Sequence, residues 1–399
     1  MGNPYRFNRL ELAGSLGDLG TLLPLAIGLI LVNKLDPTGV FWTVGLFFIL
    51  SGIYFGVTVP VQPMKVISAY AIATSMSASQ ITASGLLIGL VLLIIGITGI
   101  ITFIGRVIPS AVVRGVQLST GTLLMVQGVN FMLGVSTLQR MQNAVEPFLT
   151  LQSIGALPVG LLIGTAGGIL TLLFLDNRRF PAGLLVILAG LMLGLIFGTR
   201  LDWAEIRVGL YLPTILPFGW PSAPDFSFAL VALVLPQIPM TVGNAVVAYS
   251  DLSQEYFGNR SERVTYKASC ISMALANCFS VFVGGMPLCH GAGGLAAHYR
   301  FGARTAGSNL TIGGVFVLIA LLLGPHALAV IYLMPLSILG ILLLFAGVQL
   351  ALTIRDMTAR KDLFVCAVML GVTLATNLAA GFLVGIGVAY LLKIDKLNV

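Results

Sequence analysis

Residues 284–309 read GGMPLCHGAGGLAAHYRFGARTAGSN, and they interrupt a chain that is otherwise apolar almost from end to end. Pro287 follows a Gly-Gly pair, a combination that ends any helix arriving from upstream. Gly291, Gly293 and Gly294 then leave the backbone without side chains. Inside a bilayer, such broken backbone is tolerated only where it is buried in protein or lines a wet cavity. A helix that restarts after Pro287 would point its free N–H groups into that cavity, so this stretch is a candidate anion site.

The composition is typical of a polytopic membrane protein. The 399 residues are 57% hydrophobic and 9% charged, and the mean hydropathy is +1.02. Apolar runs of about 17–25 residues recur from Leu10 to Leu392, and each can cross ~30 Å of hydrocarbon. The net charge of +7 does not indicate a nucleic-acid partner, because the basic residues are scattered over loops. The four cysteines lack CxxC spacing and predict neither a metal site nor a disulfide framework.

We predict an all-α polytopic membrane protein with about fourteen transmembrane segments in two inverted repeats of seven. The third and tenth segments are short and interrupted by Pro or Gly, so we expect half-helices there, each preceded by a short extended stretch. The expected segments are 9–33, 38–57, 58–77, 82–104, 109–133, 151–175, 181–199, 226–250, 262–283, 286–299, 306–323, 327–349, 361–377 and 379–393.

The distribution of Lys and Arg predicts the orientation. With the N-terminus inside, most of the 21 basic residues fall in cytoplasmic loops. The opposite side receives only Lys34, Arg140, Arg200 and Arg207. By the positive-inside rule we therefore expect both the N- and C-termini to be cytoplasmic, in a multi-pass protein of the cell membrane.

The two halves of the chain look like a repeat. Gly17-Asp18 in the first segment matches Gly243-Asn244 in the eighth, and PVQP (60–63) matches PLCH (287–290) with nearly the same offset. Seven segments per half is an odd number, so the second copy must cross the bilayer inverted. Paired short, interrupted segments in two halves are the best indication in a sequence of a transporter's binding site.

Three stretches resemble the molybdate transporters related to the sulfate permeases: GSLGDLGTLLPL (14–25), VPVQPMK (59–65) and GGMPLCHGAGGLAAHYRFGART (284–305). The resemblance implies two inverted repeats of seven segments, divided between a core domain and a gate domain. The core is then expected at 1–105 and 226–323, the gate at 106–200 and 324–399, and an interfacial linker at 201–225.

The resemblance also implies where the substrate binds. It would lie between the facing N-termini of the third and tenth segments, with the eighth segment alongside. The substrate-binding residues implied in this way are Val61, Gln62, Pro63, Met64, Gln237, Thr241, Asn244, Cys289, His290, Gly291 and Ala292. Since every candidate lies on segments 1–4 and 8–11, we expect an elevator-like displacement of the core against the gate.

Two charged residues inside the membrane bear on the chemistry. A tetrahedral dianion brings a charge of about −2, and two half-helix N-termini supply together roughly +1. Lys65 directly follows the broken third segment, and a lysine inside a membrane is functional by default. It either balances the anion's charge or forms a structural pair with Asp18. Asp18 is correspondingly either a proton-coupling group or the partner of Lys65.

The sequence favours secondary active transport of an oxyanion, and we expect this transport to be a symport with protons. It contains no Walker loop, GxSxG or HExxH motif, so we predict neither an enzyme nor an ATP-driven pump, and we expect no catalytic residues and no cofactor. His290 and His298 lie two helical turns apart, about 12 Å, which is too far for one metal ion. His290 is instead a candidate hydrogen-bond donor to the anion.

Several alternatives remain open. Molybdate is favoured by the resemblance alone, while sulfate and tungstate have the same charge and shape. A passive anion channel could use the same helix dipoles, and a membrane-embedded enzyme could use Cys289 and His290. The expected partners are the oxyanion and the lipid bilayer, without nucleic acid, and the sequence leaves a homodimer open.

Overall fold

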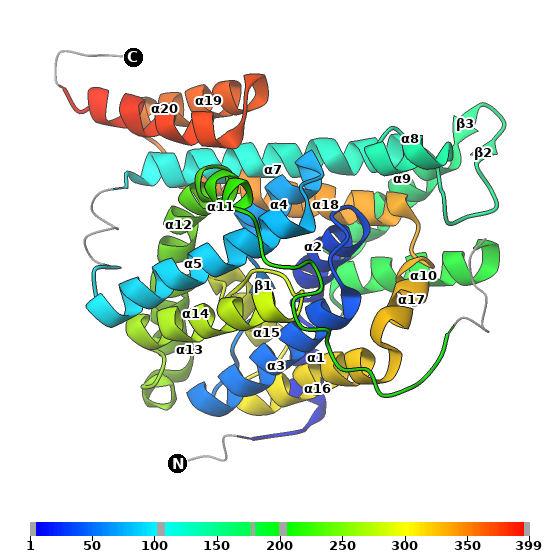
Figure 1. Cartoon of the computed structure of the whole chain (residues 1–399), viewed down its shortest axis with the longest axis horizontal. Helices are drawn as coiled ribbons and strands as arrows, with labels where there is room; N and C mark the ends of the chain where they lie inside the picture. The colour runs from blue at the N-terminus through cyan, green and yellow to red at the C-terminus, as the bar shows by residue number, and fades with distance from the viewer. Residues whose placement is uncertain (1–4, 102–107, 176, 178–179, 199–205, 395–399) are drawn as a thin grey trace.

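The computed structural model describes residues 5–101, 108–175, 177, 180–198 and 206–394, and most of these are helical (Figure 1). The first half contains α1 (Arg9–Ser15), α2 (Leu19–Leu31), α3 (Pro37–Phe55), β1 (Gln62–Pro63), α4 (Lys65–Thr74), α5 (Ala78–Thr98), α7 (Ser110–Leu133), α8 (Thr137–Gln142), β2 (Ser153–Ile154), β3 (Leu157–Pro158), α9 (Val159–Phe174) and α10 (Ala182–Phe197). The predicted segment ends at 104 and 199, and linker residues 201–205, lie outside the described residues.

The second half begins with a long composite helix made of α11 (Ala223–Ala229), η2 (Leu230–Val234), α12 (Leu235–Met240), η3 (Thr241–Ala248), α13 (Tyr249–Phe257) and η4 (Gly258–Ser261). It continues with α14 (Tyr266–Phe282), β4 (Leu288–Cys289), α15 (Ala292–Arg300), α16 (Ala306–Leu323), η5 (Gly324–His326), α17 (Ala327–Ile331), α18 (Leu336–Ala351), η6 (Leu352–Asp356), α19 (Arg360–Ala375) and α20 (Leu378–Leu391).

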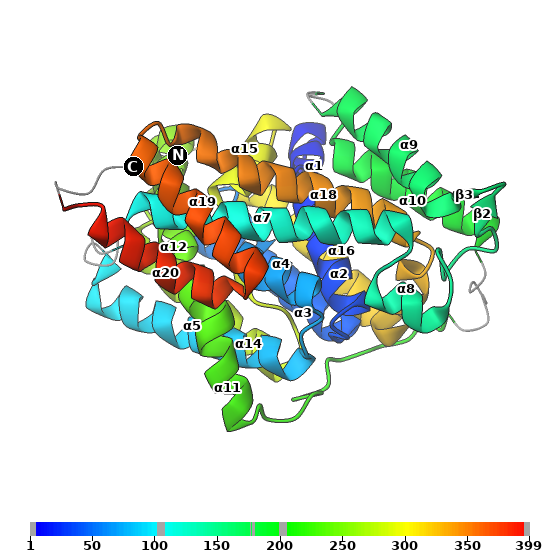
Figure 2. The ribbon, with the colours of Figure 1, turned by 90° about the horizontal axis from the view of Figure 1, so that it is seen from above.

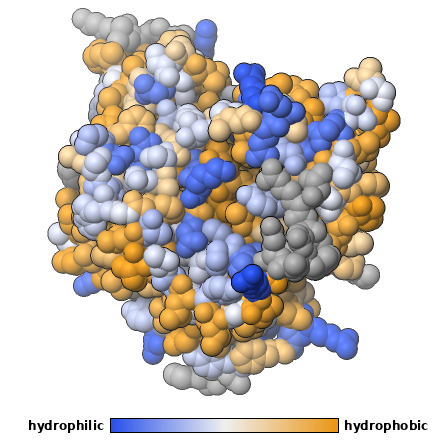
Figure 3. All heavy atoms as spheres, turned by 45° about the vertical axis from the view of Figure 1, so that its right-hand side comes forward, coloured by the Kyte–Doolittle hydropathy of each residue, from blue (hydrophilic) through white to orange (hydrophobic). Residues whose placement is uncertain are grey.

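Many of the helices suit a membrane. Among the described residues, seven helical stretches are long and apolar enough to span one: Arg9–Leu31, Pro37–Phe55, Ala78–Thr98, Ser110–Gln142, Ala223–Ser261, Ala306–Ile331 and Leu336–Asp356. The apolar helices α9, α10 and α20 are shorter. Hydrophobic residues cover much of the surface in Figure 3, as expected for helices surrounded by lipid. The prediction of a mostly helical membrane protein is confirmed.

Helices of the first half pack along helices of the second half. α3 lies along α16, α5 along α14, and α7 along α18 (Figures 1 and 2). Glycines allow the closest of these approaches: a Cβ added to Gly128 of α7 would come within 2.4 Å of the backbone oxygen of Gly340 on α18. Such small-residue contacts are the usual means by which membrane helices approach closely. The halves therefore interlock and do not form two separate bundles.

The first segment, expected to be one helix over 9–33, is broken. α1 ends at Ser15 and α2 begins at Leu19, with Asp18 at the break. A Cβ on Gly17 would lie 2.8 Å from the backbone oxygen of Ala297, so a glycine is needed for α15 to pack this closely. The break places Asp18 beside the start of α15.

The eighth segment is distorted without being broken. Pro236 and Pro239 within α12 remove two backbone donors, and the flanking turns η2 and η3 are π-helical. π-helical turns occur frequently at functional sites. Here η3 carries Thr241 and Asn244, two of the residues predicted to bind substrate.

Two other segments start differently from the prediction. The sixth, expected over 151–175, opens with the hairpin β2–β3, and α9 begins only at Val159. The twelfth, expected over 327–349, is divided into α17 and α18, because Pro335 precedes α18. The hairpin β2–β3 departs from the predicted all-α fold, whereas the strands β1 and β4 lie where short extended stretches were expected.

The two interrupted stretches meet as a two-stranded antiparallel sheet. β1 pairs with β4, with Gln62 opposite Cys289 and Pro63 opposite Leu288. The backbone N–H of Met64 adds a 2.9 Å hydrogen bond to the oxygen of Pro287. Short helices follow both strands, α4 with 10 residues and α15 with 9. The helix starts that lie far apart in the sequence are thus held side by side.

Asparagine side chains replace the missing ladder partners of these strands. Asn277 on α14 donates to the oxygen of Leu288 and accepts from its N–H, at 2.8 and 2.9 Å. Asn309 on α16 does the same for Val59, at 2.8 and 2.9 Å. Because buried backbone groups must be hydrogen-bonded, these amides allow broken backbone to lie within an apolar protein.

The described part of the linker, from residue 206, runs across helix ends of the second half. Backbone N–H groups of Gly209 and Tyr211 donate to the oxygens of Leu322 and Leu321 at the end of α16. Leu216 donates to Phe282 at the end of α14. The linker is therefore fixed to those two helices.

Candidate anion site

Two adjoining cavities of about 370 and 250 Å³ both contact α2, α4 and α15 on one side and α18 on the other. The larger is also lined by α9 and α10, and the smaller by α7 and by α12 and η3 of the eighth segment. They share the lining residues Thr21, Lys65, Gly293, Ala346 and Gln349. We call this joined space the polar cavity. Its larger part also contacts Asp18, Gln62 and Arg300, and its smaller part contacts Asn244. The polar cavity therefore gathers the charged and amide side chains that the sequence placed within apolar segments.

The start of α15 offers free donors to this space. Gly291 is the N-cap residue, and no side chain caps the helix. Within the described chain, the backbone N–H groups of Ala292, Gly293 and Gly294 have no hydrogen-bond partner. A Cβ on Gly293 would meet nothing within 4 Å, so its bare backbone faces the cavity. Unpaired N–H groups with the positive end of the helix dipole favour an anion here.

The start of α4 is arranged differently. The side-chain oxygen of Gln237 accepts from the backbone N–H groups of Val66 and Ile67, at 3.0 and 3.2 Å. Gln237 also donates to Thr241 at 2.8 Å. Two donors of α4 are therefore occupied by protein, and what α4 presents to the cavity is the Lys65 side chain. The sequence repeat alone would suggest that the two helix starts contribute equally to anion binding. In the structure they do not.

Asp18 is bonded to Gln62. The side-chain nitrogen of Gln62 donates to the Asp18 carboxylate at 2.6 Å. Both residues are buried, with exposed fractions of 5% and 1%. Asp18 forms no direct ion pair with Lys65; the ion pair found in the described chain joins Arg114 and Asp356. The structural pairing weighed in the sequence is replaced by an amide contact, and Lys65 acts on Asp18 only through space.

Among the residues of the eighth segment, Asn244 lines the smaller part of the polar cavity, whereas Thr241 and Gln237 are buried behind it. Asn244 can donate hydrogen bonds from its amide without adding negative charge. Asn244 is thus the amide that lines the cavity, whereas Gln237 and Thr241 form a hydrogen-bonded pair that orients α4.

His290 is buried and turned away from the polar cavity. Its Nδ1 donates to the backbone oxygen of Pro60 at 2.9 Å, because a carbonyl can only accept. Its Nε2 then accepts from the Ser272 hydroxyl at 3.1 Å. The ring also packs against Phe47 and Tyr249, with centroids 4.7 and 5.1 Å away. Both ring nitrogens are occupied, so the geometry gives His290 a role in positioning the broken strands.

The remaining predicted residues of the broken stretches do not line the polar cavity in the described structure: Val61, Pro63, Met64 and Cys289, which are buried, and Ala292, which is half-buried. They form the pairing of β1 with β4 and the cap of each short helix. Gly291 lies against the amide oxygen of Gln62, since a Cβ there would come within 2.0 Å of that atom.

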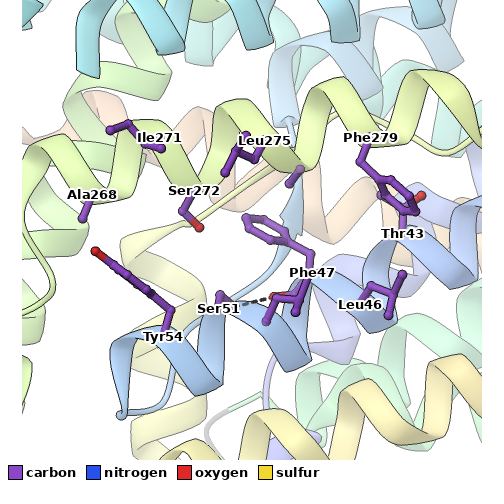
Figure 4. A pocket seen from close by; sticks show the side chains of 12 residues that line it. Thr43, Leu46, Phe47, Ser51, Tyr54, Ala268, Ile271, Ser272, Leu275 and Phe279 are labelled. Atoms are coloured by element: carbon purple, nitrogen blue, oxygen red, sulfur yellow. Dashed lines mark hydrogen bonds between the residues drawn. The ribbon is translucent and has the colours of Figure 1, made fainter. Parts of the chain in front are cut away.

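A third cavity, of about 440 Å³, lies between α3 and α14 (Figure 4). It is lined by aliphatic side chains, by three aromatic residues and by three serine or threonine residues: Phe47, Tyr54, Phe279, Thr43, Ser51 and Ser272. None of the described residues that line it is charged. An oxyanion would lose its hydration there without compensation. This cavity therefore does not fit the anion, although Ser272 connects it to His290.

Three polar residues on the opposite wall were missed from the sequence. Gln117, Gln349 and Thr353 line the smaller part of the polar cavity from α7, α18 and η6. Gln117 accepts from both Arg114 and Thr353, at 2.8 and 2.9 Å. Their position within apolar segments is the signal that could have identified them, since polar side chains in membrane spans usually face a protein interior or cavity.

Comparison with known proteins shows the family. Residues 10–124 and 229–350 match the family described as "Molybdate transporter of MFS superfamily". The chain belongs to this molybdate transporter family. It is 32% identical to Molybdate transporter 2 of Arabidopsis thaliana, over 97% of this chain and 88% of the relative. Molybdate transporter 1 of Chlamydomonas reinhardtii is 30% identical, over 95% and 90% of the two chains. One matched region lies within each predicted half of the chain.

The fold of this family member is similar to solved anion transporters. The transmembrane domain of the cyanobacterial bicarbonate transporter BicA matches with a TM-score of 0.66 and 16% identity, over 96% of this chain and 98% of BicA. Murine Slc26a9, described as an anion transporter in the inward-facing state, matches with a TM-score of 0.69 and 14% identity, over 99% and 70%. The resemblance noted in the sequence is confirmed, and the protein is an integral, multi-pass membrane transporter and not an enzyme.

Proposed function

We propose that this protein is a secondary active transporter of a tetrahedral oxyanion, with molybdate as its substrate. The observation that carries the proposal is the pairing of Lys65 with the uncapped start of α15 across one polar cavity. A lysine supplies a full positive charge and a helix start roughly half of one. Together they suit a small anion with several oxygen acceptors.

The choice of molybdate is supported by the names of relatives at 30–32% identity. Calorimetric titration of the purified protein with molybdate, tungstate and sulfate tests it. Saturable binding of molybdate, with sulfate at least tenfold weaker, is the expected result. Tighter binding of sulfate would assign the protein to that anion instead.

Charge balance supports coupling to protons. Lys65, Arg300 and one helix start provide roughly +2.5, whereas a dianion and the ionised carboxylate of the buried Asp18 together bring about −3 into the same space. A proton bound by Asp18 would remove this excess of negative charge. In proteoliposomes, an imposed pH gradient should then drive saturable molybdate accumulation against its concentration gradient. Flux that is linear in concentration and never uphill would indicate an anion channel.

The position of the cavity supports an elevator-like movement. One wall belongs to α2, α4 and α15, within the proposed core (1–105 and 226–323), and the other to α9, α10 and α18, within the proposed gate (106–200 and 324–399). Gly20 and Gly183 touch across this boundary, where a Cβ on Gly183 would lie 2.5 Å from the Cα of Gly20. A smooth, side-chain-free contact of this kind permits sliding of one domain on the other.

The same proposal includes the finer topology. We take α4 and α15 as half-helices whose N-terminal ends lie near the bilayer centre, among fourteen segments in two inverted repeats, with both termini cytoplasmic. Cysteine accessibility from each side of sealed vesicles tests this orientation. The proposal also includes assembly as a homodimer. Light scattering in detergent measures the mass of the assembly and tests this.

A further inference from the structure

We infer that the Gln62 amide is the switch that links proton binding at Asp18 to oxyanion binding at the start of α15. The inference rests on the proposed function, since it specifies how that transporter couples its two ions. Its basis is the position of a single buried amide between an acid and a helix start, with one of its two polar ends unpaired.

The geometry places Gln62 between the two sites. Its side-chain nitrogen donates to Asp18 at 2.6 Å. Its side-chain oxygen has no hydrogen-bond partner in the described structure, although Gln62 is 99% buried. That oxygen lies against Gly291, the N-cap residue of α15. The side-chain nitrogen of Asn244 is also close, 3.6 Å from the position of a Cβ on Gly291.

An ionised Asp18 determines which way the amide points. A carboxylate only accepts hydrogen bonds, so it must face the Gln62 nitrogen. The Gln62 oxygen is then directed toward the start of α15, where an oxyanion would sit. A buried Gln62 oxygen that faces an anion is unfavourable for two reasons. It has no hydrogen-bond donor, and it repels the oxygens of the anion. In this state the site disfavours the oxyanion.

A protonated Asp18 reverses the arrangement. The proton comes from water on the side where the anion binds, and the resulting O–H can donate to the Gln62 oxygen. A half-turn of the amide about its last side-chain bond brings that oxygen to Asp18 and the N–H groups to the start of α15. The same residue then adds a donor to the uncapped N–H groups of α15. Proton binding and anion binding therefore favour each other, and the coupling is reciprocal.

Other charged or titratable groups also face Asp18 and must be separated from it by experiment. Lys65 of α4 and His298 of α15 act on it electrostatically, and Cys289 of β4 is also within electrostatic reach. His298 donates from Nδ1 to the backbone oxygen of Gly14 at 2.7 Å, and its Nε2 has no hydrogen-bond partner among the described residues. His298 is thus the competing proton site, and Arg300 lines the same cavity.

The test measures the dissociation constant of molybdate against pH for five purified proteins: wild type, Gln62→Met, Asp18→Asn, His298→Gln and Gln349→Met. In wild type we expect binding to weaken with rising pH by up to tenfold per pH unit, the limit for one linked proton. Gln62→Met keeps the size of the side chain but has no amide to turn, so binding should weaken and its pH dependence should fall below twofold per unit. Asp18→Asn imitates the neutral acid and should bind independently of pH, at the strength of wild type at low pH.

The control Gln349→Met removes another amide from the same cavity that does not contact Asp18, and it should keep the wild-type slope. A wild-type slope in Gln62→Met would overturn the switch, because Asp18 would then act on the anion without the amide. A wild-type slope in Asp18→Asn, or its loss in His298→Gln alone, would assign the proton elsewhere and also overturn it. If Gln62→Met does not fold, the pH dependence of molybdate binding in Asp18→Asn and His298→Gln decides whether Asp18 binds the linked proton. Wild type that binds no molybdate at any pH would contradict the proposed function itself, a result distinct from these.

Discussion

The Glu146 carboxylate accepts a 2.8 Å hydrogen bond from the backbone N–H of Leu336, the first residue of α18 and 190 positions further along the chain. Its other oxygen accepts from Ser337 at the same distance. Pro335 cannot cap α18 with its side chain, so an acid in the connection between α8 and α9 does so. The contact joins the two parts of the proposed gate.

Glu146 predicts a specific dependence of stability on pH. Burial raises the pKa of Glu146 from an ordinary value of 4.5 to about 7, against the opposing effect of the hydrogen bonds from Ser337 and Leu336. The folded protein therefore binds this proton more tightly than the unfolded chain does, and the contribution to stability, complete below pH 4.5, is lost as the pH rises to about 7. The apparent Tm of wild type should fall more steeply over this interval than that of Glu146→Gln, whose side chain does not titrate. Parallel curves for the two proteins would contradict the prediction.

Lys65 should contribute directly to anion affinity. Lys65→Ala removes the cation that lines both parts of the polar cavity and should weaken molybdate binding by about 1–3 kcal/mol, or roughly 5- to 150-fold. Lys65→Arg retains the charge but changes its reach and planarity, so it should recover part of the loss. Calorimetry measures both, with Lys267→Ala, an exposed lysine near the start of α14, as the control. Wild-type affinity in Lys65→Ala would mean that backbone and amide donors suffice.

Two neighbouring glycines provide a matched pair. A Cβ on Gly294 would lie 2.6 Å from the Asp18 carboxylate and 2.8 Å from the Gln62 nitrogen, whereas one on Gly293 would meet nothing within 4 Å. Gly294→Ala should therefore separate Asp18 from Gln62 and lower the apparent Tm by several degrees. Gly293→Ala should keep or raise the Tm, because alanine favours the helix, while its methyl group in the cavity weakens binding. Equal Tm values for the two variants would show that the structure around Gly294 can expand.

Two variants of Asn244 test whether the ligand next to it is negatively charged. Asn244→Ala removes a neutral donor from the polar cavity and should weaken molybdate binding by about 1 kcal/mol. Asn244→Asp has nearly the same shape but places a negative charge beside the anion, so it should weaken binding considerably more. Titrations of the two variants at the same pH compare these losses. Stronger binding by Asn244→Asp than by Asn244→Ala would exclude Asn244 from the anion's surroundings.

The sequence predicted those features that depend on local chemistry. Pro60, Pro63 and Pro287 cannot continue a helix, and the structure has short strands at these places. The matching positions of Asp18 and Asn244 indicated one site built from two halves, and both line the polar cavity. Local sequence was sufficient in these cases because a proline or a glycine constrains the backbone wherever it lies.

Other features depend on contacts between distant residues, and no local pattern encodes them. Gln237 looked like an anion ligand until the structure showed its oxygen on two N–H groups of α4, a segment 170 residues away. His290 has both ring nitrogens occupied by Pro60 and Ser272, neither of which its own segment specifies. Gln117 and Gln349 line the cavity because α7 packs along α18. A polar residue in an apolar segment predicts that its side chain has a polar partner or lines a cavity. It does not identify which distant residue is that partner.

The pairing of β1 with β4 has a consequence for how the protein is made. Pro63 and Cys289 meet although they are 226 positions apart in the sequence, so at ~5–20 residues per second the first strand is synthesised about 10–45 seconds before the second. During that time Asp18 and Lys65 have been synthesised, but β4 and α15 have not. The first half therefore cannot complete the polar cavity on its own, because residues of the second half form part of its lining.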